Sequence, residues 1–177
     1  GMDAAEQWVA LTDGGNGLEP WMDVNFPRAV KILDFQHPAG YLADLAKLIA
    51  PDDSGTLLTT WCHTMKHEGG AAILEALEKL DRRRMSRAAR EQSEKTCNYI
   101  RNNLRRMKYP EYLKQGWQIG TGAVESACKT VVNWRLCAGG MRWSEAGSDE
   151  VCHLAALFRS DPDQWDAFWG HPAAMAA

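Results

Sequence analysis

Three acidic residues of this chain, Asp13, Asp34 and Glu125, stand where the sequence pattern predicts that a strand or a helix presents them. Asp13 follows the apolar run "WVALT", Asp34 ends the run "AVKILD", and Glu125 comes just after two glycines. Carboxylates gathered at strand and helix ends suit Mg²⁺, which takes oxygen ligands in near-octahedral geometry. Two such ions can hold both the attacking and the leaving oxygen of an in-line phosphoryl displacement.

Each of these residues also has an ordinary structural interpretation. Asp13 precedes a glycine-rich turn, where an aspartate commonly hydrogen-bonds its own backbone, and Asp34 fits a loop or cap position. Glu125 is suited to the positive end of a helix and to pairing with Lys129 one turn later. His37, three residues after Asp34, is more often a structural histidine than a ligand. The residues alone leave both interpretations open.

The elements that must position these acids begin with a strand–helix–strand unit. Residues 8–12 and 29–34 are predicted strands, and residues 18–25 between them are a predicted short helix. This order predicts two parallel neighbours joined by a crossover. Asp13 and Asp34 would then lie at the carboxyl ends of adjacent strands, where open α/β sheets place their chemistry.

From residue 38 onward the pattern is helical. Predicted helices cover 39–50, 56–67, 70–80, 86–108, 122–136 and 145–160, with loops at 51–55 and after Tyr109-Pro110 and a last short turn at 164–169. The chain therefore reads as one mostly helical α/β domain over residues 1–177.

Composition is that of a soluble globular protein, with 45 % hydrophobic and 24 % charged residues. No apolar run is long enough to cross a bilayer, so no membrane partner is expected. Five cysteines are scattered without a CxxC pair, which favours a reducing cytoplasm over a disulfide framework or a zinc knuckle.

The net charge of −3 hides a strong segregation of charge. Between Lys79 and Lys108 lie 11 of the 20 basic residues and three of the 23 acidic ones, a local balance of +8 against −11 elsewhere. This is either a solvated helical face or a strip that neutralises phosphates, to which arginine is suited. The candidate DNA-binding residues are Arg82, Arg83, Arg84, Arg87, Arg90, Arg101, Arg105 and Arg106.

Two long stretches resemble an insertion-sequence transposase of the Asp-Asp-Glu type, whose catalytic core is RNase H-like. "ALTDGGNGLEPWMDVNFPRAVKILDFQH" is similar to the part in which a strand ends in the second catalytic Asp and a later strand leads to a C/DxxH motif. "RNNLRRMKYPEYLKQGWQIGTGAVESACKTVVNWRLCAGGMRW" is similar to the part that carries the third acid, with its V-E-S-A-C-K and G-M-R-W motifs. The closing stretch "SEAGSDEVCHLAALFRSDPDQWDAFW" continues the likeness, so the resemblance runs along most of the length of the chain.

The resemblance implies roles for particular residues. Asp13 aligns with the second catalytic acid and Glu125 with the third, and both would bind Mg²⁺ or Mn²⁺. Asp34 and His37 match the D-x-x-H motif near the site, and Lys129 would touch a phosphate or pair with Glu125. The family's partner is DNA, both transposon ends and target. On this alignment, 8–37 is the strand–helix–strand unit, 38–108 a helical insertion, and 117–160 the catalytic-Glu helix and C-terminal helix of a partial RNase H-like core.

One departure from the family concerns its first catalytic Asp, which lies on a strand upstream of the second. Only a dozen residues precede Asp13 here, so the first acid is expected to be absent. We therefore expect a C-terminal portion of such an enzyme, inactive alone. A two-stranded sheet has open edges, which predicts a homodimer through the Asp13-bearing strand. The alternatives are a repurposed non-enzymatic module that binds DNA or protein, and a folded relic.

Overall fold

The computed structural model describes residues 4–15, 17–160 and 162–170. Its internal contacts divide the chain into two compact units, Gly1–Thr121 and Gly122–Ala177. The organisation of the chain as one domain stays a prediction.

The first unit contains a small parallel sheet. Strand β1 (Val9–Thr12) pairs with β2 (Val30–Leu33) in parallel, with Val9 opposite Val30 and Thr12 opposite Leu33. Helix α1 (Leu18–Asn25) connects them. Both predicted strands, their parallel pairing and the intervening helix are therefore confirmed. Ile32 and Leu33 are fully buried and join the sheet to the core.

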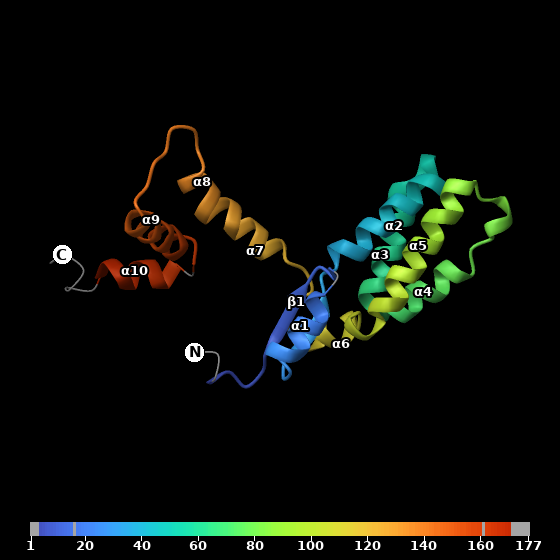
Figure 1. The fold of residues 1–177 in the computed structure, drawn as a ribbon, viewed down its shortest axis with the longest axis horizontal. Helices are drawn as coiled ribbons and strands as arrows, with labels where there is room; N and C mark the ends of the chain where they lie inside the picture. Colours follow the sequence, from blue (N-terminus) through green and yellow to red (C-terminus); the bar gives the residue numbers. More distant parts are fainter. Residues whose placement is uncertain (1–3, 16, 161, 171–177) are drawn as a thin grey trace. The chain divides into compact units, whose positions relative to one another are not determined.

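The rest of this unit is a bundle of helices, visible beside the sheet in Figure 1. Its main members are α2 (Gln36–Ile49), α3 (Ser54–Glu68), α4 (Gly70–Glu78) and α5 (Arg87–Asn103). Short 3-10 turns, η2 (Pro51–Asp53) and η3 (Arg82–Arg84), precede α3 and α5. Their apolar faces meet in one core that includes Leu42, Leu45, Met65, Ile73 and Ile100.

The region after α5 differs from the sequence-based expectation. The helix ends at Asn103, a 3-10 turn η4 (Leu104–Arg106) follows, and α6 (Tyr109–Lys114) occupies the place of a predicted loop. Proline breaks a helix interior but is tolerated in the first turn, where its missing N–H has no intrahelical acceptor. Tyr109 at the start of this helix is fully buried, and its hydroxyl donates a hydrogen bond to the Leu33 carbonyl oxygen at 3.1 Å. Both contacts hold the first turn of α6 against β2.

The corner between α3 and α4 depends on two glycines. Gly69 has a φ of 94°, which disfavours a side chain, and the Gly70 N–H donates to the Met107 carbonyl oxygen at 3.0 Å. A Cβ on Gly70 would lie 2.6 Å from the Cβ of Met107. This close approach joins the α3–α4 corner to the segment that follows η4.

The second unit is helical. Helix α7 (Gly122–Ala127), the π-helical η5 (Cys128–Asn133) and α8 (Trp134–Leu136) follow without a break, as predicted for residues 122–136. Helix α9 (Glu145–Phe158) starts after Ser144, whose Oγ accepts from the Gly147 N–H at 3.1 Å, and α10 (Pro162–Gly170) replaces the predicted short turn. Ala155 is the one buried apolar residue among those described here.

The fold is therefore mostly helical, with one two-stranded parallel sheet, as the sequence predicted. Within the described ranges, no helix combines the length and apolar character that crossing a membrane requires.

Candidate functional site

Asp13 and Asp34 leave the sheet side by side at its carboxyl edge. The register pairs Thr12 with Leu33, and each aspartate is the next residue of its strand. The Asp34 N–H donates to the Thr12 carbonyl oxygen at 2.8 Å, which extends the ladder to this point. Their predicted position at the ends of adjacent strands is confirmed, but their surroundings differ.

Asp13 is exposed and begins a tight turn. Its Oδ1 accepts from the Gly15 N–H at 2.8 Å, so the turn interpretation holds for this residue. Gly14 has a φ of 77°, and a Cβ there would lie 2.8 Å from Cδ1 of Leu33 and 3.0 Å from the Tyr99 hydroxyl. The glycine lets the turn approach the core while the Asp13 carboxylate stays accessible.

Asp34 is 1 % exposed, and its carboxylate is used inside the fold. Oδ1 accepts from the Gln36 N–H at 2.8 Å, at the start of α2. Oδ2 accepts from the Thr121 N–H at 3.1 Å and from the Thr121 hydroxyl. This carboxylate therefore fits the cap interpretation, and it ties a distant segment to the end of β2.

That segment, residues 117–121, runs to the carboxyl edge of the sheet before α7 begins. The Phe35 N–H donates to the Ile119 carbonyl oxygen at 2.8 Å, next to the hydrogen bonds of Thr121. Trp117 and Ile119 pack against the core of the first unit. The chain is thus anchored at the level of Asp13 and Asp34 up to the residue before Gly122.

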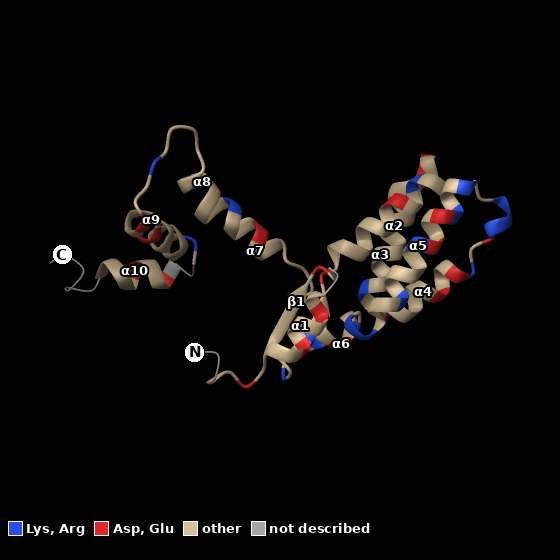
Figure 2. Ribbon diagram, viewed as in Figure 1, with Lys and Arg blue, Asp and Glu red and all other residues tan. Residues whose placement is uncertain are grey.

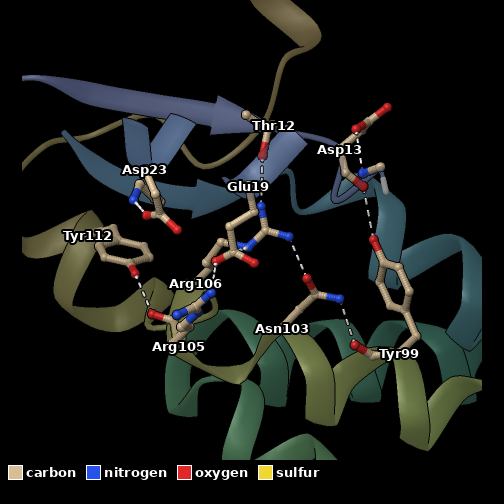
Figure 3. A network of polar contacts seen from close by, with 11 residues as sticks. Thr12, Asp13, Glu19, Asp23, Tyr99, Asn103, Arg105, Arg106 and Tyr112 are labelled. Atoms are coloured by element: carbon tan, nitrogen blue, oxygen red, sulfur yellow. Dashed lines mark hydrogen bonds and ion pairs between the residues drawn. The ribbon is translucent and has the colours of Figure 1, made fainter. Parts of the chain in front are cut away.

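Arg106 hydrogen-bonds Thr12, the last residue of β1 directly before the Asp13 turn, as Figure 3 shows. Its side chain is 4 % exposed, and its Nη1 donates to Thr12 Oγ1 at 2.9 Å while Nη2 donates to Asn103 Oδ1. Its Nε lies 3.8 Å from Glu19 Oε1 without a hydrogen-bond partner. A buried guanidinium held in this way does not fit the predicted contact with a DNA backbone.

The hydroxyl of Tyr99 completes the support, since it donates to the Asp13 carbonyl oxygen at 3.0 Å. Burial, followed by the nearby Tyr41, raises the pKa of Tyr99 to about 12, so the phenol stays a neutral donor. Tyr99, Asn103 and Arg106 lie one turn apart at the end of α5 and in η4. Sequence reasoning missed Tyr99 and Asn103, although their helical spacing with Arg106 was visible.

A cavity of about 480 Å³ lies beside the Asp13 turn. It brings Asp13 and the exposed His37 together with Glu19, Tyr99 and Arg106, whereas Asp34 is not among its lining residues. Two of the three predicted site residues in the first unit's strand–helix–strand region, the accessible Asp13 carboxylate and the His37 imidazole, therefore line the same cavity.

Glu125 and Lys129 belong to the second unit. Glu125 lies in α7 and Lys129 in the π-helical η5, and both are exposed. A π-helical turn inside an α-helix is rare and is frequently found at functional sites. The convergence of Glu125 with Asp13 stays a prediction.

The predicted arginines fall into two groups. Figure 2 shows the first at the end of the bundle away from the sheet, and we call it the basic tip. The basic tip consists of Arg82, Arg83, Arg84, Arg87 and Arg90, in η3 and at the start of α5. Arg101, Arg105 and Arg106 lie at the other end of α5, and a 17-residue helix is about 25 Å long.

The two groups also differ in how their side chains are used. Arg84 and Arg87 are 92 % and 93 % exposed, with surface ion pairs to Asp81 and Glu91. At the other end, Arg101 pairs with Glu78 at 2.7 Å and Arg105 with Glu19 at 2.6 Å. Arg84 and Arg87 are therefore more exposed than the second group, in which Arg101, Arg105 and Arg106 are 49 %, 69 % and 4 % exposed, whereas Arg82 of the basic tip is 39 % exposed.

The described residues contain no group of three or more His, Cys, Asp or Glu side chains placed to hold a metal ion. No protein-family model, curated protein or solved structure matches this chain.

Proposed function

We propose that this chain is the C-terminal part of the RNase H-like catalytic core of a DDE-type transposase. In the intact enzyme, metal-dependent phosphoryl transfer would cut and join DNA at the ends of a mobile element. The proposal assigns Asp13 and Glu125 as two acids of the catalytic set and Mg²⁺ or Mn²⁺ as the cofactor. No residue of this chain is matched to the first acid.

One observation carries the proposal: the hydrogen bonds from Thr121 to the Asp34 carboxylate. They hold the chain just before α7 at the same sheet edge from which Asp13 emerges. Glu125 is four residues later, and four residues reach at most about 14 Å. That Asp13 and Glu125, 112 positions apart in sequence, serve one site is part of the proposal.

The residues present fit part of such a metal site. Asp13 offers an accessible carboxylate beside a cavity, and Glu125 offers a second from a helix start, the oxygen ligands that Mg²⁺ prefers. Bound metal would stabilise the attacking and leaving oxygens of a phosphodiester. Two carboxylates hold the ion weakly, so we expect millimolar affinity and no strand transfer by this chain alone.

Other residues of the site act on orientation. Tyr99 holds the Asp13 carbonyl oxygen, Arg106 holds the hydroxyl of the preceding Thr12, and His37 borders the same cavity as Asp13. In the proposal, His37 contacts a ligand and Lys129 contacts a phosphate or pairs with Glu125. Asp34 fixes the segment before α7 instead of binding metal.

The test is a Mn²⁺ titration followed by water proton relaxation. Asp13→Asn and Glu125→Gln should each weaken binding at least about threefold, and the double variant should lose little more, because coupled ligands are non-additive. Asp44→Asn, which alters an exposed carboxylate on α2, is the matched control. Independent, additive losses would mean two unrelated weak sites and would overturn the shared site.

The basic tip is proposed to hold DNA backbone without reading sequence. Neutralising five phosphates gives a slope of log affinity against log salt of about −4.5 on B-DNA. Replacing Arg87 and Arg90 with alanine should reduce the slope by about one each, whereas Lys66→Ala on α3 should leave it unchanged. No gel retardation at low salt would exclude DNA as a partner of this surface.

A second candidate is a non-enzymatic module that binds DNA through the basic tip. The observation that favours it is the exposure of Arg84 and Arg87, which needs no catalytic acids. If Asp13→Asn and Glu125→Gln change neither Mn²⁺ binding nor DNA retardation, this module is the better description.

A homodimer through β1 remains part of the proposal. Val9 on this strand is 40 % exposed, and β1 pairs only with β2 among the described residues. Unpaired strand edges favour association with another strand. Sedimentation over a hundredfold range of concentration tests it, and a constant monomer mass would exclude the dimer.

A further inference from the structure

His63 and His67 form a pair of imidazoles on the surface of α3. Both are exposed, they are four residues apart, and their ring centroids are 4.4 Å apart with planes tilted by 41°. Residues four apart lie on the same face of a helix, so the rings meet because of regular geometry. This pair lies outside the cavity beside Asp13.

We propose that His63 and His67 bind one divalent transition-metal ion of the class Zn²⁺, Ni²⁺ and Cu²⁺. Imidazole nitrogen suits these ions, whereas Mg²⁺ prefers oxygen, so this site is chemically distinct from the proposed catalytic one. Two ligands from one helix leave coordination positions for water. Because water can fill the remaining positions, the site needs only two protein ligands, which agrees with the lack of a three-residue group among the described residues.

The helix makes the pair a chelate. Both side chains come from one stable element, so the second imidazole binds at high effective concentration once the first has bound. The ordinary alternative is that His67, together with Lys66 in the last turn of α3, interacts with the carboxyl end of the helix dipole, while His63 is a surface residue of the preceding turn.

The position of the pair gives metal binding a structural consequence. His67 lies in the last turn of α3, directly before the Gly69–Gly70 corner that packs on Met107. Terminal turns fray because their last carbonyl groups lack intrahelical partners. A metal bridge between His63 and His67 links the last turn to the preceding one and thereby stabilises the corner.

The experiment is NMR of tag-free protein with ¹⁵N-labelled histidine, titrated with Zn²⁺ or Ni²⁺ alone. The imidazole signals of His63 and His67 should shift with Zn²⁺ and broaden with Ni²⁺ together at one stoichiometric ion, ahead of those of His37 and His153. Backbone amides of α3's last turn should exchange more slowly with Zn²⁺ bound. Equal response of all exposed histidines would overturn the site.

Variants separate the pair from other ligands. His63→Gln and His67→Gln should each weaken Ni²⁺ affinity at least about tenfold, because each removes half of the chelate. His153→Gln on α9 is the matched control, and replacing the exposed Cys128 and Cys137 with serine should leave the affinity unchanged. Loss of affinity with the thiols, and none with the imidazoles, would assign the metal to cysteine and refute the proposal.

Discussion

The carboxylate of Asp34 and the backbone of Thr121, 87 residues apart, are joined by a 3.1 Å hydrogen bond that fixes where the chain leaves the first unit. The Thr121 hydroxyl donates to the same carboxylate oxygen. Asp34 is thereby a structural residue, whereas Asp13, its neighbour across the sheet, is left accessible. The stability of this junction can be measured apart from any activity.

Asp34→Ala should lower the free energy of unfolding by about 3 kcal/mol. It leaves the Gln36 N–H and the Thr121 N–H and hydroxyl without their acceptor. Hydrogen bonds to charged groups contribute about 1.5 to 3 kcal/mol each, but Gln36 is exposed and Thr121 is half-buried, so water replaces part of what these donors lose. Urea denaturation measures the change. Asp44→Ala, an exposed aspartate on α2, should stay within about 0.5 kcal/mol, and equal losses for both would contradict the role of Asp34.

Arg106→Met should cost about 3 kcal/mol or more, while Arg105→Met should cost less than about 1 kcal/mol. The two neighbours both approach Glu19, but the Arg106 side chain is 4 % exposed and that of Arg105 is 69 % exposed. Breaking a buried network leaves unpaired groups, whereas exposed ion pairs are screened by water. Urea denaturation of both variants checks the contrast, and a reversed order would refute it.

Tyr99 should make folding sensitive to alkaline pH. Burial raises its pKa to about 12 from an ordinary value near 10, so the unfolded chain releases this proton first. Between these values the unfolded state binds fewer protons than the folded state, so the free energy of unfolding falls as pH rises. In titrations of the folded proteins followed by phenolate absorbance, Tyr99→Phe should lack the ionisation of one tyrosine near pH 12 that the unsubstituted chain shows. A difference near pH 10 would contradict the burial effect.

Two glycine substitutions should act in opposite directions. Gly70→Ala places a Cβ 2.6 Å from Met107 Cβ and should cost about 1 to 3 kcal/mol by overpacking. Gly40→Ala, within α2, meets nothing within 4 Å and should add about 0.5 to 1 kcal/mol, because alanine is the better helix residue. Thermal unfolding of both variants measures this. A stabilised Gly70→Ala would show that the α3–α4 corner is not closely packed.

Local structure was largely predictable from the sequence. Apolar runs ending at Asp13 and Asp34 marked both strands to within about one residue, and helical periodicity located α3, α4, α9 and the helix from 122 to 136. These signals are local, since they depend on alternation, capping and glycine turns within a few residues. Helix α6 was not predicted, because a Tyr-Pro pair is typical of a helix break. In the structure, the burial of Tyr109 and Tyr112 stabilises this helix.

The sequence by itself determined which residue types reach the carboxyl edge of the sheet: two aspartates, a glycine turn and a histidine. Only the tertiary structure decided that the Asp34 carboxylate is buried and hydrogen-bonded to Thr121, whereas the Asp13 carboxylate is exposed. It also decided that Arg106 is buried and hydrogen-bonded to Thr12, next to Asp13. The physical reason is that burial and hydrogen bonding here arise between residues 87 and 94 positions apart. Such contacts depend on how helices pack, and no local pattern encodes them.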